Sequence, residues 1–467
     1  MNWQQLMSSK HFASAGPDGE AAVRDDYDTI ICSTLFRRLQ DKAQVFPLDN
    51  DDYVRTRLTH SLEVSAIGKR LGAQVFSMLR EAEKDGWFER HTEKSFADVL
   101  LCAGLVHDIG NPPFGHFGEY AIREWFQNNL EGMRLGGEKV SGILTEWQRE
   151  DLLHFEGNAQ SLRLLSKTPY LGSRAGFNLS YAVLGSILKY PVSSADLKRR
   201  NPRGYKKMGY NYAERELFCD MDAVMGLNGC RHPLSYLLEA ADDIAYRTSD
   251  LEDAMVKKVV TLQQILEEFD QQRITLDAAD TPAGRAAIRH MDKLEELYRE
   301  EKLNHRRKAE LTAVQRWNQY LQGVMVQDAA RSFVKHYEEL MQGELQGDLF
   351  DDTASGYLIE IISVISEKYV YSSSIKTMPE LFGRRVIHSL LDQFMPAAIL
   401  YDTEEQSTFI DRRTIDTVSD FYKSMYRSES VGKSAGDRLY LRMLMITDYI
   451  SGMTDNYAKR LYQDLYV

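Results

Sequence analysis

Apolar residues recur at intervals of three and four positions along most of this 467-residue chain. This spacing is typical of amphipathic α-helices, whereas the strict alternation that marks a half-buried β-strand is nearly absent. The pattern therefore predicts an all-α fold. Its clearest helical segments are 28–42, 59–80, 158–165, 233–254, 313–342, 357–368 and 438–465.

A small β-hairpin is the most sheet structure that the pattern allows. It would pair 44–46 with 53–55 across a turn of proline, leucine, aspartate and asparagine. Glycine-rich or charged segments predict loops at 135–142, 193–209 and 343–356, and solvated helices or a linker at 277–307. We place a soft boundary near residue 275. It separates a catalytic core, 1–275, from a helical region, 276–467, that packs on this core and on neighbouring subunits.

Composition narrows the functional classes. Hydrophobic residues make up 43% of the chain and aromatic residues 10%, which is typical of a globular protein. The net charge of −12 offers no global attraction to nucleic acid, although it leaves room for a local basic patch. The four cysteines lack the close spacing of a zinc site or a disulfide framework. Because neither a signal peptide nor an apolar membrane span is evident, we expect a cytoplasmic protein.

The stretch from Leu101 to Glu119 concentrates the most chemistry. Its apolar start predicts a buried helix that delivers His107 and Asp108 at its end, where Gly-Asn-Pro-Pro must stop the helix. His116 and Glu119 then follow as a candidate catalytic pair. A His-Asp pair alone is more often a hydrogen-bonded core pair than a ligand pair. The metal interpretation gains weight from matching partners in 55–60 and 239–250.

The segment 239–250 adds a spacing argument. Asp242, Tyr246 and Asp250 are four residues apart, so on a helix they share one face at about 6 Å per step. This face can offer a metal ligand, a phenol and a carboxylate in line. The alternative is a solvated acidic face, and Asp243 competes for the ligand position. The spacing to Tyr246 favours Asp242.

The predicted metal ligands are two imidazoles and two carboxylates. Such a mixed set suits an octahedral divalent ion with positions left for water and substrate, unlike the cysteine-rich ligation of structural zinc. We expect one ion per subunit, Mn²⁺ or Mg²⁺, with Fe, Co or Ni as further candidates. Mg²⁺ fits this set less naturally. The four ligands are His60, His107, Asp108 and Asp242.

The order H…HD…D resembles that of the HD-domain phosphohydrolase superfamily. Within this superfamily, six segments closely resemble bacterial deoxyguanosinetriphosphate triphosphohydrolases. The resemblance runs from about Phe36 to the C-terminal helix and is weaker between about 265 and 435. The segments are VRTRLTHSLEV, HDIGNPPFGHFGE, HFEGNAQ, ILKY, EAADDIAYRTSDLEDA and DYISGMTDNYA.

The resemblance implies hydrolysis of a deoxynucleoside triphosphate, dGTP above all, to the deoxynucleoside and inorganic triphosphate. A nearby acid must then protonate the departing 5′-oxygen. His116 is the best candidate, with Glu119 to orient its ring and His154 as a third member. The alternative for His116 is a simple hydrogen bond to a backbone carbonyl.

The resemblance also assigns substrate contacts. Cations must offset the triphosphate charge. The alternative for Lys198, Arg199, Arg200, Lys206 and Lys207 is a solvated basic loop, and we favour this alternative for the first three. A tyrosine face against C2′ would exclude a ribose hydroxyl, while an amide and a carboxylate would hold the 3′-hydroxyl. The phosphate candidates are Arg57, Lys189, Tyr190 and Lys207, and the sugar candidates are Gln44, Tyr246 and Asp250.

Other functions share parts of this pattern. An HD-type nucleotidase or phosphodiesterase would use the same metal ligands without a triphosphate clamp, and a broad-specificity dNTP triphosphohydrolase would use all of them. A nucleotide-sensing or single-strand-binding regulator would keep only a vestigial site. The intact His116 and Glu119 argue against such a regulator.

The segment 438–465 carries too much apolar surface for a solvent-facing tail, so it must pack against the core or another subunit. Similar bacterial triphosphohydrolases form closed homo-oligomers, commonly hexamers, and some respond to single-stranded DNA or dNTPs. The resemblance therefore implies a hexamer and a nucleic-acid or nucleotide effector.

Overall fold

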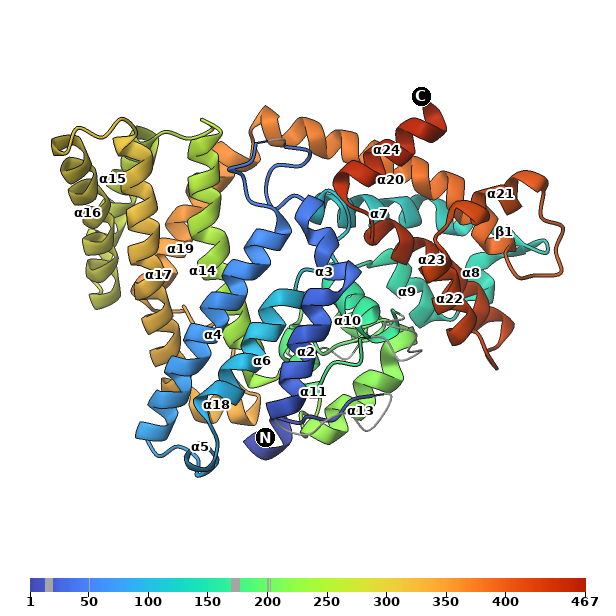
Figure 1. Ribbon diagram of the computed structural model, residues 1–467, viewed down its shortest axis with the longest axis horizontal. Coiled ribbons are helices and arrows are strands. Elements are labelled where there is room, and N and C mark those ends of the chain that lie inside the picture. Colours follow the sequence, from blue (N-terminus) through green and yellow to red (C-terminus); the bar gives the residue numbers. More distant parts are fainter. Residues whose placement is uncertain (13–19, 50, 169–176, 200, 202) are drawn as a thin grey trace.

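The computed structural model describes residues 1–12, 20–49, 51–168, 177–199, 201 and 203–467. Within these residues the fold is helical, and its only sheet is a two-stranded antiparallel hairpin, so the predicted all-α class is confirmed (Figure 1). No helix in this described part of the chain carries an apolar stretch of the length and purity that a membrane crossing demands.

Three central helices form the scaffold of the site. α4 (Arg57–Glu81) packs along α6 (Glu93–Val106), and α14 (Pro233–Val256) packs against α4. The approach is close because glycine faces the neighbouring helix: a Cβ added at Gly104 would lie 2.6 Å from the Cα atom of Ser65. Such contact fixes the relative positions of the residues that these helices carry.

Further helices enclose this scaffold. α17 (Ala309–Lys335) packs on α4 and α14, and with α15 (Leu262–Ala279) and α16 (Pro282–Leu303) it forms the left end of Figure 1. On the opposite side, α20 (Ser374–Leu400) packs on α7 (Gly115–Asn129), and the C-terminal helices lie against α20. The remaining longer helices are α2 (Glu20–Cys32), α9 (Glu146–Leu153), α10 (Gly157–Lys167), α11 (Tyr181–Ile187), α13 (Arg215–Met225), α19 (Ala354–Ile365), α21 (Phe409–Thr417), α22 (Asp420–Glu429), α23 (Ala435–Ser451) and α24 (Asp455–Tyr466).

Short elements connect these helices. They are α1 (Trp3–Leu6), α3 (Thr34–Arg38), α5 (Trp87–Arg90), α8 (Val140–Ile143), α12 (Asp196–Arg199), α18 (Tyr337–Gln342), the 3₁₀ turns η1 (Leu39–Asp41), η2 (Leu130–Gly132) and η3 (Tyr212–Glu214), the π-helix η4 (Ser366–Tyr371), and the strands β1 (Arg134–Leu135) and β2 (Glu138–Lys139).

Two predicted helices are each divided by a cap. The segment 28–42 breaks at Ser33, whose side chain accepts a hydrogen bond from the N–H of Phe36 and starts α3. The segment 438–465 breaks after Ser451, and Thr454 caps α24 by accepting from the N–H of Tyr457. Both residues satisfy N–H groups that a continuous helix would have paired internally.

The hairpin was predicted at the wrong place. Segments 44–46 and 53–55 form no ladder, and only a single bridge joins Ala43 to Thr56 nearby. The observed strands β1 and β2 lie at the start of a predicted loop, joined by Gly136 and Gly137 with φ of 58° and 84°. Two consecutive positive φ angles are what a tight two-residue hairpin turn requires, and glycine adopts them without strain.

Buried ion pairs connect the C-terminal helices to the first half of the chain. Arg163 of α10 contacts Asp448 of α23 at 2.8 Å and Glu214 at 2.9 Å, and all three side chains are buried. A buried cation with matched carboxylates holds these elements in one arrangement. The predicted boundary near residue 275 falls inside α15, and the division into two domains stays a prediction.

Candidate active site

The start of α4 and the end of α6 present two imidazoles to each other. Thr56 caps α4 through a reciprocal bond with Thr59, which sets the first turn that carries His60. His107 closes α6, where its Nδ1–H donates to the carbonyl of Gly104 at 2.8 Å. This bond leaves Nε2 of His107 as the acceptor, directed away from the helix.

These imidazoles converge with α14 on one point. Donor atoms of His60, His107 and Asp242 all lie within 4.8 Å of one another. Nε2 of His60 is 3.0 Å from Oδ1 of Asp242, and Nε2 of His107 is 3.7 Å from the same oxygen. Nε2 of His107 is buried without a hydrogen-bond partner among the described residues. The group therefore fits a divalent cation, which would use that nitrogen.

Asp108 borders this group. Its Oδ1 is 3.6 Å from Nε2 of His107, while Oδ2 accepts from Nη1 of Arg57 at 2.7 Å and the amide of Asn111 donates to Oδ1. Although burial opposes its charge, Arg57 and the two imidazoles hold the pKa of Asp108 well below its usual value. Asp108 is thus an ionised carboxylate at the edge of the candidate metal centre.

A cavity of about 400 Å³ opens beside this centre. Most of the predicted site residues line it, and Asn111, Asn158, Arg247, Tyr371, Lys376 and Glu380 join them without having been predicted. Three predicted residues, Glu119, His154 and Asp250, do not line it. The predicted residues on its wall are Gln44, Arg57, His60, His107, Asp108, His116, Lys189, Tyr190, Lys207, Asp242 and Tyr246.

His116 and Glu119 form a pair at the start of α7. Phe114, in the left-handed conformation at φ 64°, turns the chain so that α7 begins at Gly115. Nδ1 of His116 lies 3.5 Å from Oε1 of Glu119, with the His116 side chain 77% exposed and that of Glu119 2% exposed. Burial disfavours the carboxylate, but the bond to His116 lowers the pKa of Glu119 overall. The pair can hold and exchange a proton at the cavity wall.

His154 lies apart from this pair. Its Nδ1–H donates to the backbone carbonyl of Glu150 at 3.0 Å, one turn earlier in α9, and the ring is not on the cavity wall. The predicted catalytic role of His154 gains no support from this placement and stays a prediction.

The face of α14 extends from the metal centre in the predicted order. Tyr246 lines the cavity, and Asp250 lies buried behind it. Tyr371 of η4 inserts its hydroxyl between them, contacting the Tyr246 hydroxyl and donating to Asp250 at 3.2 Å. Oδ1 of Asp250 and Oε1 of Gln44 are buried without hydrogen-bond partners among the described residues. Unpaired buried acceptors of this kind suit a ligand hydroxyl.

The predicted phosphate-binding cations are each paired with a carboxylate. Nζ of Lys189 contacts Glu239, and Nζ of Lys207 donates to Oε1 of Glu156 at 2.9 Å. Tyr190 lines the wall beside Lys189, whose Nζ lies 5.7 Å from the ring centre. The side chains of 198–200 and 202 lie outside the described residues.

The C-terminal turn holds two walls of the cavity through their backbone. Asp455, the buried first residue of α24, accepts from the N–H of Phe114 at 3.0 Å and from the N–H of Ala43 at 3.1 Å. Lys42 is also buried, and its Nζ donates to the carbonyls of Asn111 and Ser451. The turn thereby fixes both the segment that carries Gln44 and the loop that starts α7.

Comparisons with known proteins agree with this geometry. A model of the HD domain matches residues 57–156. The chain is 40% identical, over 100% of its length and 99% of the relative's, to a deoxyguanosinetriphosphate triphosphohydrolase-like protein of Listeria monocytogenes. It is 32% identical to a protein of the same description from Pseudomonas aeruginosa, over 100% of this chain and 98% of that protein.

A deoxyguanosinetriphosphate triphosphohydrolase of Serratia proteamaculans is also 32% identical, over 94% of this chain and 92% of that protein. These matches, together with a His-His-Asp group that can hold a divalent ion, identify a metal-dependent phosphohydrolase. The chain belongs to the family of deoxyguanosinetriphosphate triphosphohydrolase-like HD-domain proteins.

Proposed function

We propose that this protein hydrolyses a deoxynucleoside triphosphate, with dGTP as the preferred substrate, to the deoxynucleoside and inorganic triphosphate. One observation carries the proposal: a single cavity is lined by the candidate metal centre, by the three predicted cations and by Tyr246, with Asp250 buried behind Tyr246. Phosphates, sugar and the scissile bond can therefore be held together. The names of the relatives favour the same substrate.

The reaction adds water to the α-phosphorus and breaks its bond to the 5′-oxygen. A divalent ion at His60, His107, Asp108 and Asp242 would supply Lewis-acid chemistry at the phosphoryl group. His116 would deliver a proton to the departing 5′-oxygen, and Glu119 would orient the ring and stabilise its charged form. We propose Mn²⁺ or Mg²⁺ as the ion.

The sugar would lie against α14. Tyr246 lines the cavity, where a 2′-hydroxyl would meet its side chain. The unpaired acceptors of Gln44, on the wall, and of Asp250, buried behind Tyr246, would hold the 3′-hydroxyl. Tyr371 braces both Tyr246 and Asp250 through its hydroxyl. We therefore add Tyr371 to the residues proposed to select deoxyribose.

Product analysis tests the proposal. The protein is incubated with each of the four dNTPs and with GTP in the presence of Mn²⁺, and the released phosphates are separated. Inorganic triphosphate formed fastest from dGTP supports it, and equal rates from all four dNTPs would indicate broad specificity. Pyrophosphate or orthophosphate would indicate a nucleotidase or phosphodiesterase instead, and no product a regulator.

We further propose that the chain assembles as a homo-oligomer, a hexamer by resemblance. Ile375, Met378 and Leu381 follow one face of α20 and are 44%, 65% and 53% exposed, which is unusual for large apolar side chains on a helix. A second subunit would cover this face. Light scattering that returns a monomer mass of 53.6 kDa at micromolar concentration would refute the assembly.

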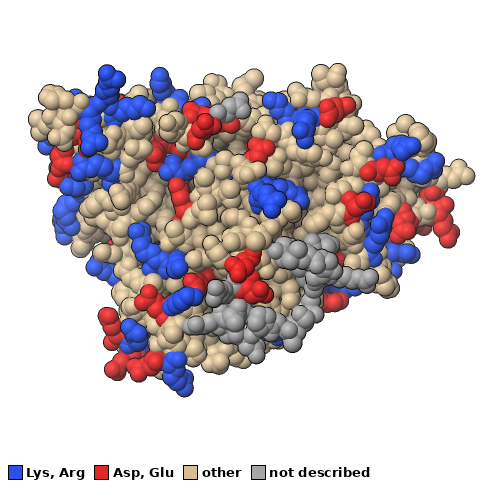
Figure 2. Space-filling model, viewed as in Figure 1, with Lys and Arg blue, Asp and Glu red and all other residues tan. Residues whose placement is uncertain are grey.

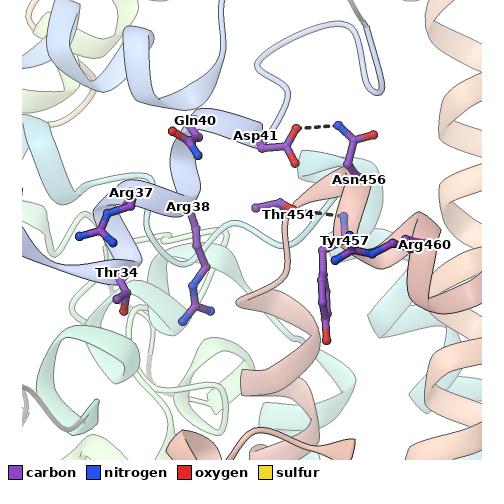
Figure 3. A pocket seen from close by; sticks show the side chains of 9 residues that line it. All are labelled: Thr34, Arg37, Arg38, Gln40, Asp41, Thr454, Asn456, Tyr457 and Arg460. Atoms are coloured by element: carbon purple, nitrogen blue, oxygen red, sulfur yellow. Dashed lines mark hydrogen bonds between the residues drawn. The ribbon is translucent and has the colours of Figure 1, made fainter.

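A nucleotide effector has a candidate place in a second cavity. Arg38 of α3 and Arg460 of α24 extend into this space of about 540 Å³, at whose edge the amide of Asn456 donates to Asp41 (Figure 3). Three of its lining residues, Arg37, Arg38 and Arg460, are cations suited to phosphate.

The structure offers less support for single-stranded DNA as the effector. Lysines and arginines gather over α15 to α17 at the left edge of Figure 2, but many are paired, as Arg273 is with Asp292 at 2.7 Å. We therefore favour a nucleotide as the effector. Rates measured for one dNTP with a second dNTP or an oligonucleotide added would test this choice, and flat kinetics with both would refute control by either.

A further inference from the structure

The motif HFEGNAQ places the carboxylate of Glu156 next to the site. Glu156 precedes α10, and its side chain is 2% exposed. Its Oε1 accepts from Nζ of Lys207 and from the amide of Asn158, both at 2.9 Å, and Nη1 of Arg123 lies 3.9 Å from Oε2. Lys207 and Asn158 line the cavity, so Glu156 lies directly behind its wall.

Glu156 also adjoins the proposed proton-transfer pair. His116, Glu119 and Arg123 are spaced three and four residues apart, so they follow one face of α7. The carboxylate of Glu119 reaches the backbone beside Glu156: a Cβ added at Gly157 would lie 2.5 Å from its Oε1. Burial, followed by the negative charge of Glu119, raises the pKa of Glu156, and Lys207 opposes this effect.

Two kinds of anion can therefore pair with the ammonium group of Lys207. In the absence of substrate this group pairs with the carboxylate of Glu156. A bound polyphosphate carries about four negative charges and competes with one carboxylate for the same ammonium group. When Lys207 turns to the phosphates, Glu156 keeps Arg123 and the amide of Asn158, so it is not left as an isolated buried charge.

We propose that Glu156 is a positioning residue of the polyphosphate site. Its carboxylate holds Lys207 at the cavity wall until the phosphates of the substrate replace it as the partner of the ammonium group. This inference rests on the proposed function. Inorganic triphosphate should therefore bind more weakly than it would without the Glu156 carboxylate, because the Lys207–Glu156 pair re-forms as the product leaves. Glu156 thus acts through Lys207 and takes no part in bond cleavage.

Titration calorimetry with inorganic triphosphate tests the inference on the full-length, Mn²⁺-loaded protein. Glu156→Gln removes the competing charge but keeps an acceptor for Asn158, so triphosphate should bind about fivefold more tightly, in line with the loss of one partly exposed ion pair. Deoxyguanosine carries no phosphate, and its affinity should stay unchanged. A general structural defect would weaken both ligands.

Two variants make the comparison specific. In a Lys207→Gln background, Glu156→Gln should no longer alter triphosphate affinity, because the competing pair is already absent. Glu124→Gln removes a carboxylate of α7, next to Arg123, that pairs with Arg384 at 2.6 Å outside the cavity, and it should leave triphosphate binding at the wild-type level. If Glu156→Gln does not fold, Glu156→Asp replaces it, with a smaller gain in affinity expected.

Unchanged or weaker triphosphate binding by the folded Glu156 variant overturns the inference, as does a gain that persists without Lys207. The proposed function fails separately, when the wild-type protein releases no triphosphate from any dNTP. A wild-type protein that releases triphosphate, combined with a Glu156→Gln variant of unaltered affinity, refutes this inference alone. A wild-type protein that releases triphosphate but does not bind it in the calorimeter also refutes this inference alone, because no phosphate then competes for Lys207.

Discussion

Replacing Gly157 by alanine should greatly lower the turnover of this protein while leaving its free energy of unfolding almost unchanged. Gly157 is the first residue of α10, and its φ is in the range that alanine adopts readily. The added Cβ would lie 2.5 Å from Oε1 of Glu119 and 2.8 Å from Oδ1 of Asn111. Because ordinary contacts begin at 3.4 Å, the Glu119 oxygen would have to retreat by about 0.9 Å and the Asn111 oxygen by about 0.6 Å.

The displaced atoms are side-chain ends, so the fold can accommodate the change at small cost. Alanine in place of glycine also favours a helix by about 0.5–1 kcal/mol, and we expect the free energy of unfolding to change by less than about 1 kcal/mol. The function should suffer far more. Glu119 holds His116, Asn111 holds Asp108, and a displacement near 1 Å in such a constellation costs about a hundredfold in rate.

The assay compares turnover of dGTP with the urea midpoint for wild type, Gly157→Ala and a control. Gly323→Ala is the matched control, because Gly323 lies within α17 and a Cβ there meets no atom within 4 Å. The control should gain stability and keep full activity. A Gly157→Ala protein that turns over dGTP at the wild-type rate would show that the His116–Glu119 geometry does not govern the reaction.

Four further predictions follow from the site. Asp242→Asn should abolish bound Mn²⁺ in metal analysis whereas Asp243→Asn should retain it, and the reverse result would move the ligand to Asp243. His116→Ala should keep metal and substrate affinity but lose turnover about a hundredfold, and an unchanged kcat would remove this histidine from the mechanism. Tyr246→Ala should raise the ratio of kcat/KM for GTP to that for dGTP by roughly tenfold, and a constant ratio would place sugar selection elsewhere. Burial lowers the pKa of Lys42 to about 7. The folded state then binds fewer protons than the unfolded state above this pH, so unfolding in urea should show wild type gaining about 1.5 kcal/mol more than Lys42→Met between pH 7 and 8.5.

The proposed metal ligands were accessible to sequence reasoning because each lies in a local pattern. His107 ends an apolar helix before a proline break, and Asp242 belongs to a helix with fourfold spacing. The structure brings both together with His60. Such patterns can be recognised in the sequence because the helix period and the residues that end a helix are set by short-range effects.

Tyr371 and Asp455 were missed for different physical reasons. Tyr371 ends a π-helix, whose wider turn does not follow the three- and four-residue spacing that predicts α-helices, and its partner Asp250 is far away in the sequence. Asp455 acts on the N–H groups of Phe114 and Ala43, and any residue other than proline supplies such a group. Neither contact can therefore be predicted from a local sequence pattern.

The misplaced hairpin has a similar origin. Strand-forming side chains at 44–46 outweighed the turn signal of Gly136 and Gly137, which lies between two short and largely exposed strands. The turn residues were the better guide, because two positive φ angles in sequence are costly for residues other than glycine, asparagine and aspartate. The breaks at Ser33 and Thr454 likewise depend on single capping side chains within long apolar patterns.

The contacts of Asp455 have a consequence for the order in which the protein is synthesised. Translation produces the proposed metal ligands His60, His107 and Asp242 well before residue 455, so a nascent chain that folds α4, α6 and α14 would already carry the candidate metal centre. The backbone of Phe114, which sets the start of α7 and so the position of His116, receives its fixed acceptor only when residue 455 has been added. Metal capture on the ribosome would therefore precede catalytic competence, and a partly synthesised chain could hold its ion without consuming the nucleotide pool around it.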